Sequence, residues 1–145
     1  MRVPAIRFLA CLSALALAAP GLAQDAKPKT LYELFGLKEP GLRGAELDAA
    51  VAKASAFPLG SEQNPVRVRG PAGERDYIAR LRCSDGRAPV IRGRATAMPS
   101  PFGGITDQYV VDCKDSTPAT ASVYMDMYHD HVEDRPVPGF TVKPQ

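Results

Sequence analysis

The sequence has few of the residues on which catalytic and metal sites are usually built. Its 145 residues include no Trp, only two His and only three Cys. Two His exclude a catalytic zinc ion held by three His. There is no G-x-S-x-G pattern, which would mark a nucleophilic Ser in many hydrolases. These absences favour a non-enzymatic protein and leave a metal-dependent hydrolase as a minor alternative.

Long apolar runs are also absent, apart from one near the N-terminus. Two Arg precede this run, which covers residues 8–19, and small residues follow it. The pattern is typical of a secretory signal peptide, which we expect to be cleaved after Ala23. The run is too short to span a bilayer, so no transmembrane segment is expected. A lipid anchor at Cys11 is a weaker alternative, because little apolar sequence precedes that residue. We therefore predict a signal peptide over 1–23 and a periplasmic or secreted protein.

Cleavage would change both the charge and the cysteine count. The signal peptide contains two of the 18 Lys and Arg residues and none of the 16 Asp and Glu residues, so the mature net charge is zero. A net charge of zero and the lack of a known motif argue against nucleic-acid binding. The remaining Cys83 and Cys113 are predicted to form a disulfide in an oxidising compartment. Its closure should contribute about 3–4 kcal/mol to stability.

The rest of the sequence predicts helices followed by strands. After a disordered leader over 24–29, we expect a single α+β domain over 30–145. A capping box at 30–33 predicts a short helix, and an apolar stripe predicts a second helix over 43–55. From Asn64 onward the apolar residues alternate, as is typical of strands. The expected fold is one or two N-terminal helices and a mainly antiparallel sheet of about five short strands.

The first two strands are predicted to form a hairpin, with "GPAGER" as its turn. If Arg69 lies opposite Asp76, all the apolar side chains of the two strands share one face. The other face is a candidate surface for an anionic ligand or a protein partner in the cell envelope. Alternatively, neighbouring acidic strands neutralise its charge. The outward Arg residues of this hairpin are Arg67, Arg69, Arg80 and Arg82.

Three further strands are predicted near 90–95, 107–113 and 121–129, followed by an extended, Pro-rich tail. The loop over 96–106 lies between the two Cys and could present a binding edge. In that hypothesis Phe102 is exposed and serves as an anchor for a partner. The alternative is a plain connection, with Phe102 folded back onto the core.

The stretch "VYMDMYHDHVED" over 123–134 is the candidate metal site. On a strand, Met125, Met127, His129 and His131 would share one face, and such soft and imidazole ligands suit copper, with zinc as a second possibility. The competing interpretation is an ordinary strand with Val123 and both Met in the core. In that case Asp126 points outward and the His residues are solvated.

The segments "GSEQNPVRVRGPAGERDYIARLRC", "VYMDMYH" and "PVPGFT" resemble small uncharacterised secreted proteins of Gram-negative bacteria. The resemblance covers most of the chain from Gly60 onward. It implies export and a single domain, and it carries no catalytic residue. Our leading hypothesis is an exported binding protein of the cell envelope, with a periplasmic copper- or zinc-binding protein as the alternative.

Overall fold

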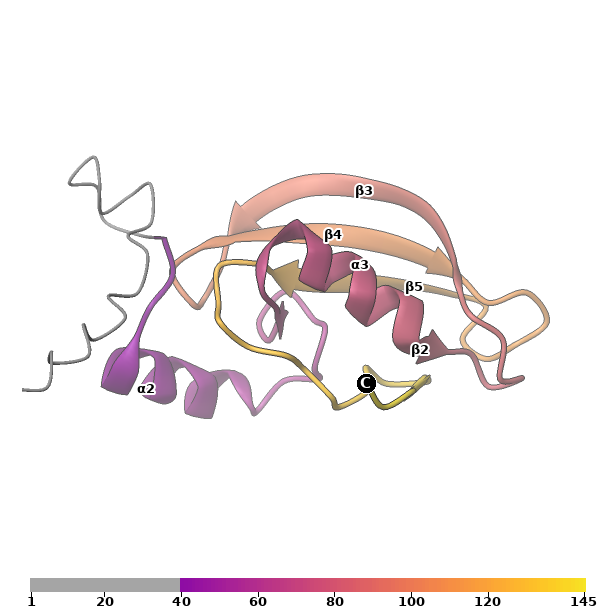
Figure 1. The fold of residues 1–145 in the computed structure, drawn as a ribbon, viewed down its shortest axis with the longest axis horizontal. Coiled ribbons are helices and arrows are strands. Elements are labelled where there is room, and N and C mark those ends of the chain that lie inside the picture. Colours follow the sequence, from indigo (N-terminus) through magenta and orange to yellow (C-terminus); the bar gives the residue numbers. More distant parts are fainter. Residues whose placement is uncertain (1–39) are drawn as a thin grey trace, which may run out of the picture.

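The computed structural model describes residues 40–145. The predicted signal peptide, leader and first helix lie outside these residues. The described part has an α+β fold, and none of its helices is long and apolar enough to cross a membrane. Its elements are α2 (Gly44–Ala54), β1 (Val66–Arg67), α3 (Gly70–Arg80), β2 (Leu81–Arg82), β3 (Val90–Pro99), β4 (Ile105–Asp112), β5 (Thr120–Asp126) and β6 (Thr141–Val142) (Figure 1).

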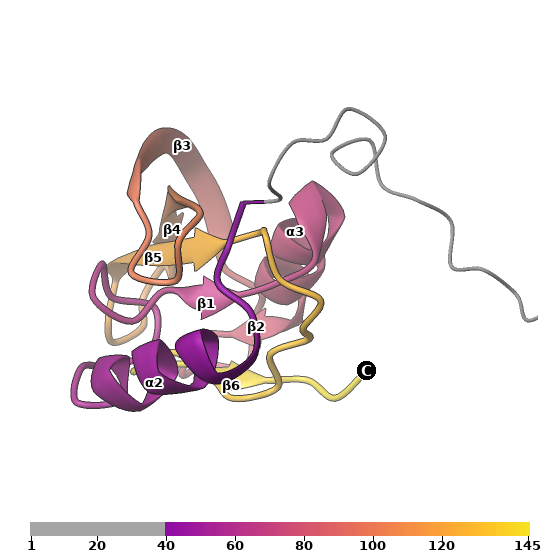
Figure 2. The ribbon, with the colours of Figure 1, turned by 90° about the vertical axis from the view of Figure 1, so that its left-hand side faces the viewer.

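The main sheet has four strands in the order β1-β5-β4-β3. Its three long strands are antiparallel, whereas β1 runs parallel to β5. Strands β2 and β6 form a separate antiparallel pair. Figure 2 shows α3 on one side of the main sheet, with β1 between α3 and α2. The chain after β5 runs back past α3 before it reaches β6, so it can form a surface together with that helix.

The predicted hairpin over 64–83 is wrong, because its second half is helix α3. Pro71 stands in the first turn of this helix, where its missing N–H costs nothing. The buried side chains Glu74, Tyr77, Ile78 and Leu81 follow helical spacing. Tyr77 and Leu81 also fit an alternating pattern, which explains the error. Ile78, predicted to point outward, is only 3% exposed.

The other predicted strands are confirmed with shifted ends. Strand β3 begins at Val90 and continues to Pro99, so the predicted loop over 96–106 shrinks to 100–104. Strand β4 covers most of its predicted range, and β5 ends at Asp126, earlier than predicted. The predicted helix over 43–55 is confirmed as α2.

The core lies between α3 and the main sheet and is closed by the predicted disulfide. Cys83 and Cys113 are both buried, and their Cα atoms are 5.7 Å apart. Cys83 follows β2 and Cys113 follows β4, so the disulfide connects the two sheets. The buried side chains around it include Val66, Val68, Tyr77, Leu81, Val111, Val123, Met125, Val137 and Phe140.

Candidate functional site

The four predicted Arg residues do not share one hairpin face, because Gly70–Arg80 forms helix α3. Arg67 lies over the ring of Phe102, with its guanidinium carbon 5.7 Å from the ring centroid. Arg82 donates hydrogen bonds to the carbonyls of Ala79 and Leu81. Both side chains are therefore used within the fold. Arg69 and Arg80, in contrast, line a common groove at the two ends of α3.

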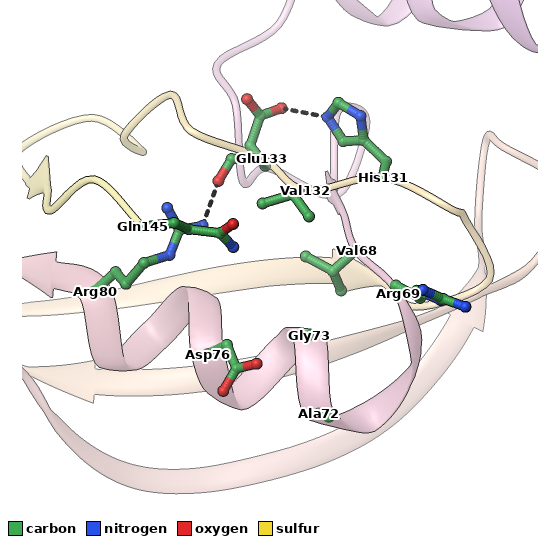
Figure 3. A pocket seen from close by; sticks show the side chains of 10 residues that line it. All are labelled: Val68, Arg69, Ala72, Gly73, Asp76, Arg80, His131, Val132, Glu133 and Gln145. Atoms are coloured by element: carbon green, nitrogen blue, oxygen red, sulfur yellow. Dashed lines mark hydrogen bonds and ion pairs between the residues drawn. The ribbon is translucent and has the colours of Figure 1, made fainter.

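This groove has a volume of about 240 Å³ and lies between α3 and residues 131–133 (Figure 3). Its helical wall follows the i, i+3, i+4 and i+7 spacing of one helix face. Ala72 and Gly73 lie in the middle of that wall, and their small size leaves the hollow. A Cβ at Gly73 would stand 3.2 Å from that of Val68. The lining residues are Val68, Arg69, Ala72, Gly73, Asp76, Arg80, His131, Val132, Glu133 and Gln145.

The opposite wall of the groove is held in place by long-range hydrogen bonds. Arg80 donates from Nη2 to the Glu133 carbonyl at 2.6 Å and from Nη1 to the Asp134 carboxylate at 2.8 Å. The hydroxyl of Tyr77 donates to the Arg135 carbonyl at 2.8 Å. The irregular chain after β5 is thus fastened to the C-terminal half of α3, which forms one end of the groove.

The two Arg residues of the groove differ in how strongly they are held. The side chain of Arg80 is only 14% exposed, whereas that of Arg69 is 80% exposed. Arg69 lies 3.5 Å from Asp130, which is equally exposed, and such surface pairs contribute little to stability. The Arg69 guanidinium can therefore exchange this partner for a ligand, while Arg80 is part of the groove's framework.

His131 and Glu133 add little net charge to the groove. Burial lowers the pKa of His131, and the nearby Arg67 lowers it further, although Glu133, 3.6 Å away, acts in the opposite direction. His131 is therefore mainly neutral at pH 7. Burial works against the charge of Glu133, but hydrogen bonds from Arg135 outweigh it and hold the pKa of Glu133 below its ordinary value. The charge of Glu133 is thus balanced outside the groove.

His129 is buried, contrary to the prediction that it is solvated. It is 4% exposed, and its Nε2 atom lies 3.2 Å from Oδ2 of Asp126. Asp126, predicted to point outward, is also buried. Phe102 packs edge-on against the His129 ring at a centroid distance of 5.9 Å and is 1% exposed. The hypothesis of an exposed Phe102 anchor is therefore wrong, and the alternative of a core residue is confirmed.

The four proposed metal ligands have different surroundings. Met125 is wholly buried in the core, and Met127 packs against that core. His129 faces Asp126, whereas His131 faces Glu133. Within residues 40–145, no group of three or more His, Cys, Asp and Glu side chains is placed to hold a metal ion. The metal hypothesis stays a prediction without a ligand cluster in this part of the chain.

A buried carboxyl pair was missed by the sequence analysis. Glu74 is 0% exposed and lies beside Asp107, which is 3% exposed. The hydroxyl of Tyr109 donates to Oε2 of Glu74 at 3.0 Å, and Arg94 contacts both carboxyl groups. Burial, and then hydrogen bonding to Asp107, raises the pKa of Glu74 to about 7. Glu74 stood in the predicted turn, and only its helical spacing to Tyr77 and Ile78 could have revealed it.

A second, wider depression of about 530 Å³ lies between α2 and the turn that joins β3 to β4. Its lining residues include Lys53, Phe57, Glu62 and Pro101. None of the predicted binding residues lines it. The groove beside α3 is therefore the better candidate site, although it is smaller.

Comparison with protein-family models, with curated proteins and with solved structures finds no match for this chain. The resemblance to secreted proteins of Gram-negative bacteria stays a prediction.

Proposed function

We propose that this protein is an exported, non-enzymatic binding protein of the cell envelope. Its site is the groove between α3 and residues 131–133, and its ligand is a small molecule with one anionic group and a short apolar body. The observation that carries this proposal is the groove itself, which combines an apolar floor with an Arg at each end. The buried disulfide supports export, because such bonds persist in oxidising compartments.

The apolar part of the groove suits a short aliphatic chain. Val68 forms the floor and is almost fully buried, while Val132 on the opposite wall is 47% exposed. Figure 3 shows both side chains directed into the space above Gly73. Covering exposed apolar surface contributes about 25 cal/mol per Å². A ligand that covers Val132 therefore gains binding energy from surface that is otherwise in contact with water.

The charged part of the groove suits a single negative charge. Arg69 has a weak surface partner, and it precedes an α3 N-terminus that has no side-chain cap and no acidic residue in its first turn. The helix dipole adds a positive potential at that end. Asp76, one turn further along the same wall, repels additional negative charge. The arrangement favours a monoanion over a polyanion.

Calorimetric titration with hexanoate tests this function on the mature, disulfide-bonded protein. At about 0.5 kcal/mol per non-hydrogen atom, hexanoate should bind with a Kd of about 1 mM. Ala72→Leu should abolish binding, because the larger side chain fills the hollow. Ala79→Leu is the matched control, since Ala79 is exposed on α3 but does not line the groove. Equal binding by both variants, or no binding by the unmodified protein, would refute the proposal.

The contribution of charge is tested with 1-hexanol, which has the same apolar body without the carboxylate. Hexanol should bind more weakly than hexanoate, and added salt should weaken only hexanoate binding. Arg69→Gln should reduce the difference between the two probes. Equal binding of both probes would show that the groove recognises only the apolar body.

A further inference from the structure

The N-terminal half of α3, which forms the helical wall of the groove, is attached to the sheet by a polar side chain. Tyr77 and Ile78 anchor the C-terminal half of the helix in the core. In the N-terminal half, Glu74 is the one buried residue. Side chains two residues apart on a helix point to different sides, so Glu74 faces the sheet while Ala72 and Asp76 face the groove. The N–H of Gly70, the first residue of α3, donates to the carbonyl of Met127 at 2.8 Å, so the backbone holds the helix start. Between that residue and Tyr77, the packing of Glu74 sets how closely this wall lies on the sheet.

The surroundings of Glu74 favour the protonated form of its carboxyl group. The titratable and charged groups that face it are Asp107 and Tyr109 from β4 and Arg94 from β3. Tyr109 donates to Oε2 of Glu74, but Oε1 has no donor among the described residues. A buried carboxylate oxygen without a donor is costly, whereas a protonated carboxyl group carries no charge and can donate to a neighbouring carboxylate.

The charge balance leads to the same conclusion. Arg94 supplies one positive charge to Glu74 and Asp107, and its stronger contact is with Asp107. A second carboxylate would be buried without a partner of opposite charge, which is costly. Both carboxyl groups are almost fully buried, so solvent does not screen them. The pair is thus stable with a single proton and unstable when both groups are ionised.

We propose that the proton shared by Glu74 and Asp107 regulates the groove. With the proton present, the N-terminal half of α3 is seated on the sheet and the groove has the shape described above. Loss of the proton loosens the packing of this half of the helix and weakens ligand binding, while the Gly70 hydrogen bond holds the helix start and Tyr77 and Ile78 hold the other half. This regulation rests on the proposed function of the groove. Because burial raises the pKa of Glu74 to about 7, the change falls in the neutral pH range.

The absence of Trp from the chain allows a direct optical test. Val132 is half-exposed and lines the groove, so Val132→Trp places a single fluorophore beside α3. Its emission maximum should shift between about pH 6 and about pH 8. The helical circular dichroism signal should fall by no more than the contribution of one turn of α3. Adding Glu74→Gln should abolish the shift, because Gln keeps the shape of the protonated Glu and cannot ionise.

Glu62→Gln, which changes an exposed Glu away from the groove, is the matched control and should leave the shift unchanged. His131 is adjacent to the probe, but burial lowers its pKa from the ordinary value of 6.5, away from the pKa of about 7 for Glu74. A shift that survives Glu74→Gln would overturn the proposal. Unfolding of the whole protein in the same pH range would also overturn it.

Hexanoate binding to the unmodified protein separates this inference from the proposed function. We expect the unmodified protein to bind hexanoate several-fold more weakly at about pH 8 than at about pH 6. Glu74→Gln should bind hexanoate equally well at both pH values. Equal binding by the unmodified protein at both values would overturn the regulation while the binding function stands. If hexanoate binds at neither value, the binding function fails, and with it the regulation of binding, whatever the Trp emission shows.

Discussion

Replacing Glu74 by Gln should stabilise the protein increasingly as the pH rises from about 4.5 to about 7. The Glu74 carboxyl is fully buried, and burial raises its pKa from the ordinary value of 4.5 to about 7. In this range the unfolded chain has lost the proton while the folded protein still holds it. The stability that comes from the neutral carboxyl is therefore complete below pH 4.5 and is lost as the pH rises through about 7.

The size of this effect follows from the two pKa values. The difference between about 7 and 4.5, at 1.36 kcal/mol per pKa unit, corresponds to about 3 kcal/mol. This is a large part of the 5–15 kcal/mol by which folded domains are usually stable. Gln can still accept the hydrogen bond from Tyr109 and can donate to Asp107, so the variant loses no contact.

Urea unfolding of the disulfide-bonded protein at several values between about pH 5 and about pH 8 measures this effect. The free energy of unfolding of Glu74→Gln, relative to the unmodified protein, should rise by up to about 3 kcal/mol across the range. Glu62→Gln should show no such trend, because Glu62 is exposed. The reasoning is refuted if Glu74→Gln and the unmodified protein have the same pH dependence.

Two further predictions concern the core. Met125→Ala should lower the free energy of unfolding by about 2–5 kcal/mol, because Met125 is wholly buried, whereas Met98→Ala, at a half-exposed position of β3, should change it little. Urea unfolding compares the two variants, and equal losses would contradict the assignment of Met125 to the core. Replacing both Cys83 and Cys113 by Ser should cost about 3–4 kcal/mol, and a variant as stable as the oxidised protein would show that the disulfide does not constrain the chain.

Much of the strand structure could be predicted, because local patterns determine it. Tyr109, Val111 and Cys113 alternate along β4 and are all buried, as expected for one face of a half-buried strand. The disulfide was predicted from two Cys that remain if a signal peptide with Cys11 is removed, together with an expected oxidising compartment. Such features depend on residues close together in the sequence or on composition alone.

Helix α3 was mispredicted for a physical reason. Tyr77 and Leu81 are four residues apart, a spacing that suits both a helix face and an alternating strand. Glu74 and Ile78 decide between the two, but a charged residue gives no apolar signal. Glu74 is buried among distant residues: Tyr109, 35 positions away, donates a hydrogen bond to it, and Arg94 contacts its carboxyl group. Pro71 at the helix start was the local signal for a helix.

The groove could not be predicted for a similar reason. It exists because Arg80 and Tyr77 hold residues 133–135 against α3 through contacts that span more than 50 positions. His129 is buried because Phe102, from the turn between β3 and β4, packs against its ring and Asp126 lies beside it. Interactions of this range leave no pattern in a single sequence.

The location of the binding site is tested most directly by nuclear magnetic resonance. Hexanoate would be titrated into the ¹⁵N-labelled, disulfide-bonded protein while the amide shifts are followed. We expect the largest chemical-shift changes at the amides of Ala72, Gly73 and Val132. In Ala72→Leu, hexanoate should cause no such changes in this region. Changes confined to the wider depression around Ala54 and Phe57, or no changes at all, would contradict the assignment of the groove as the binding site.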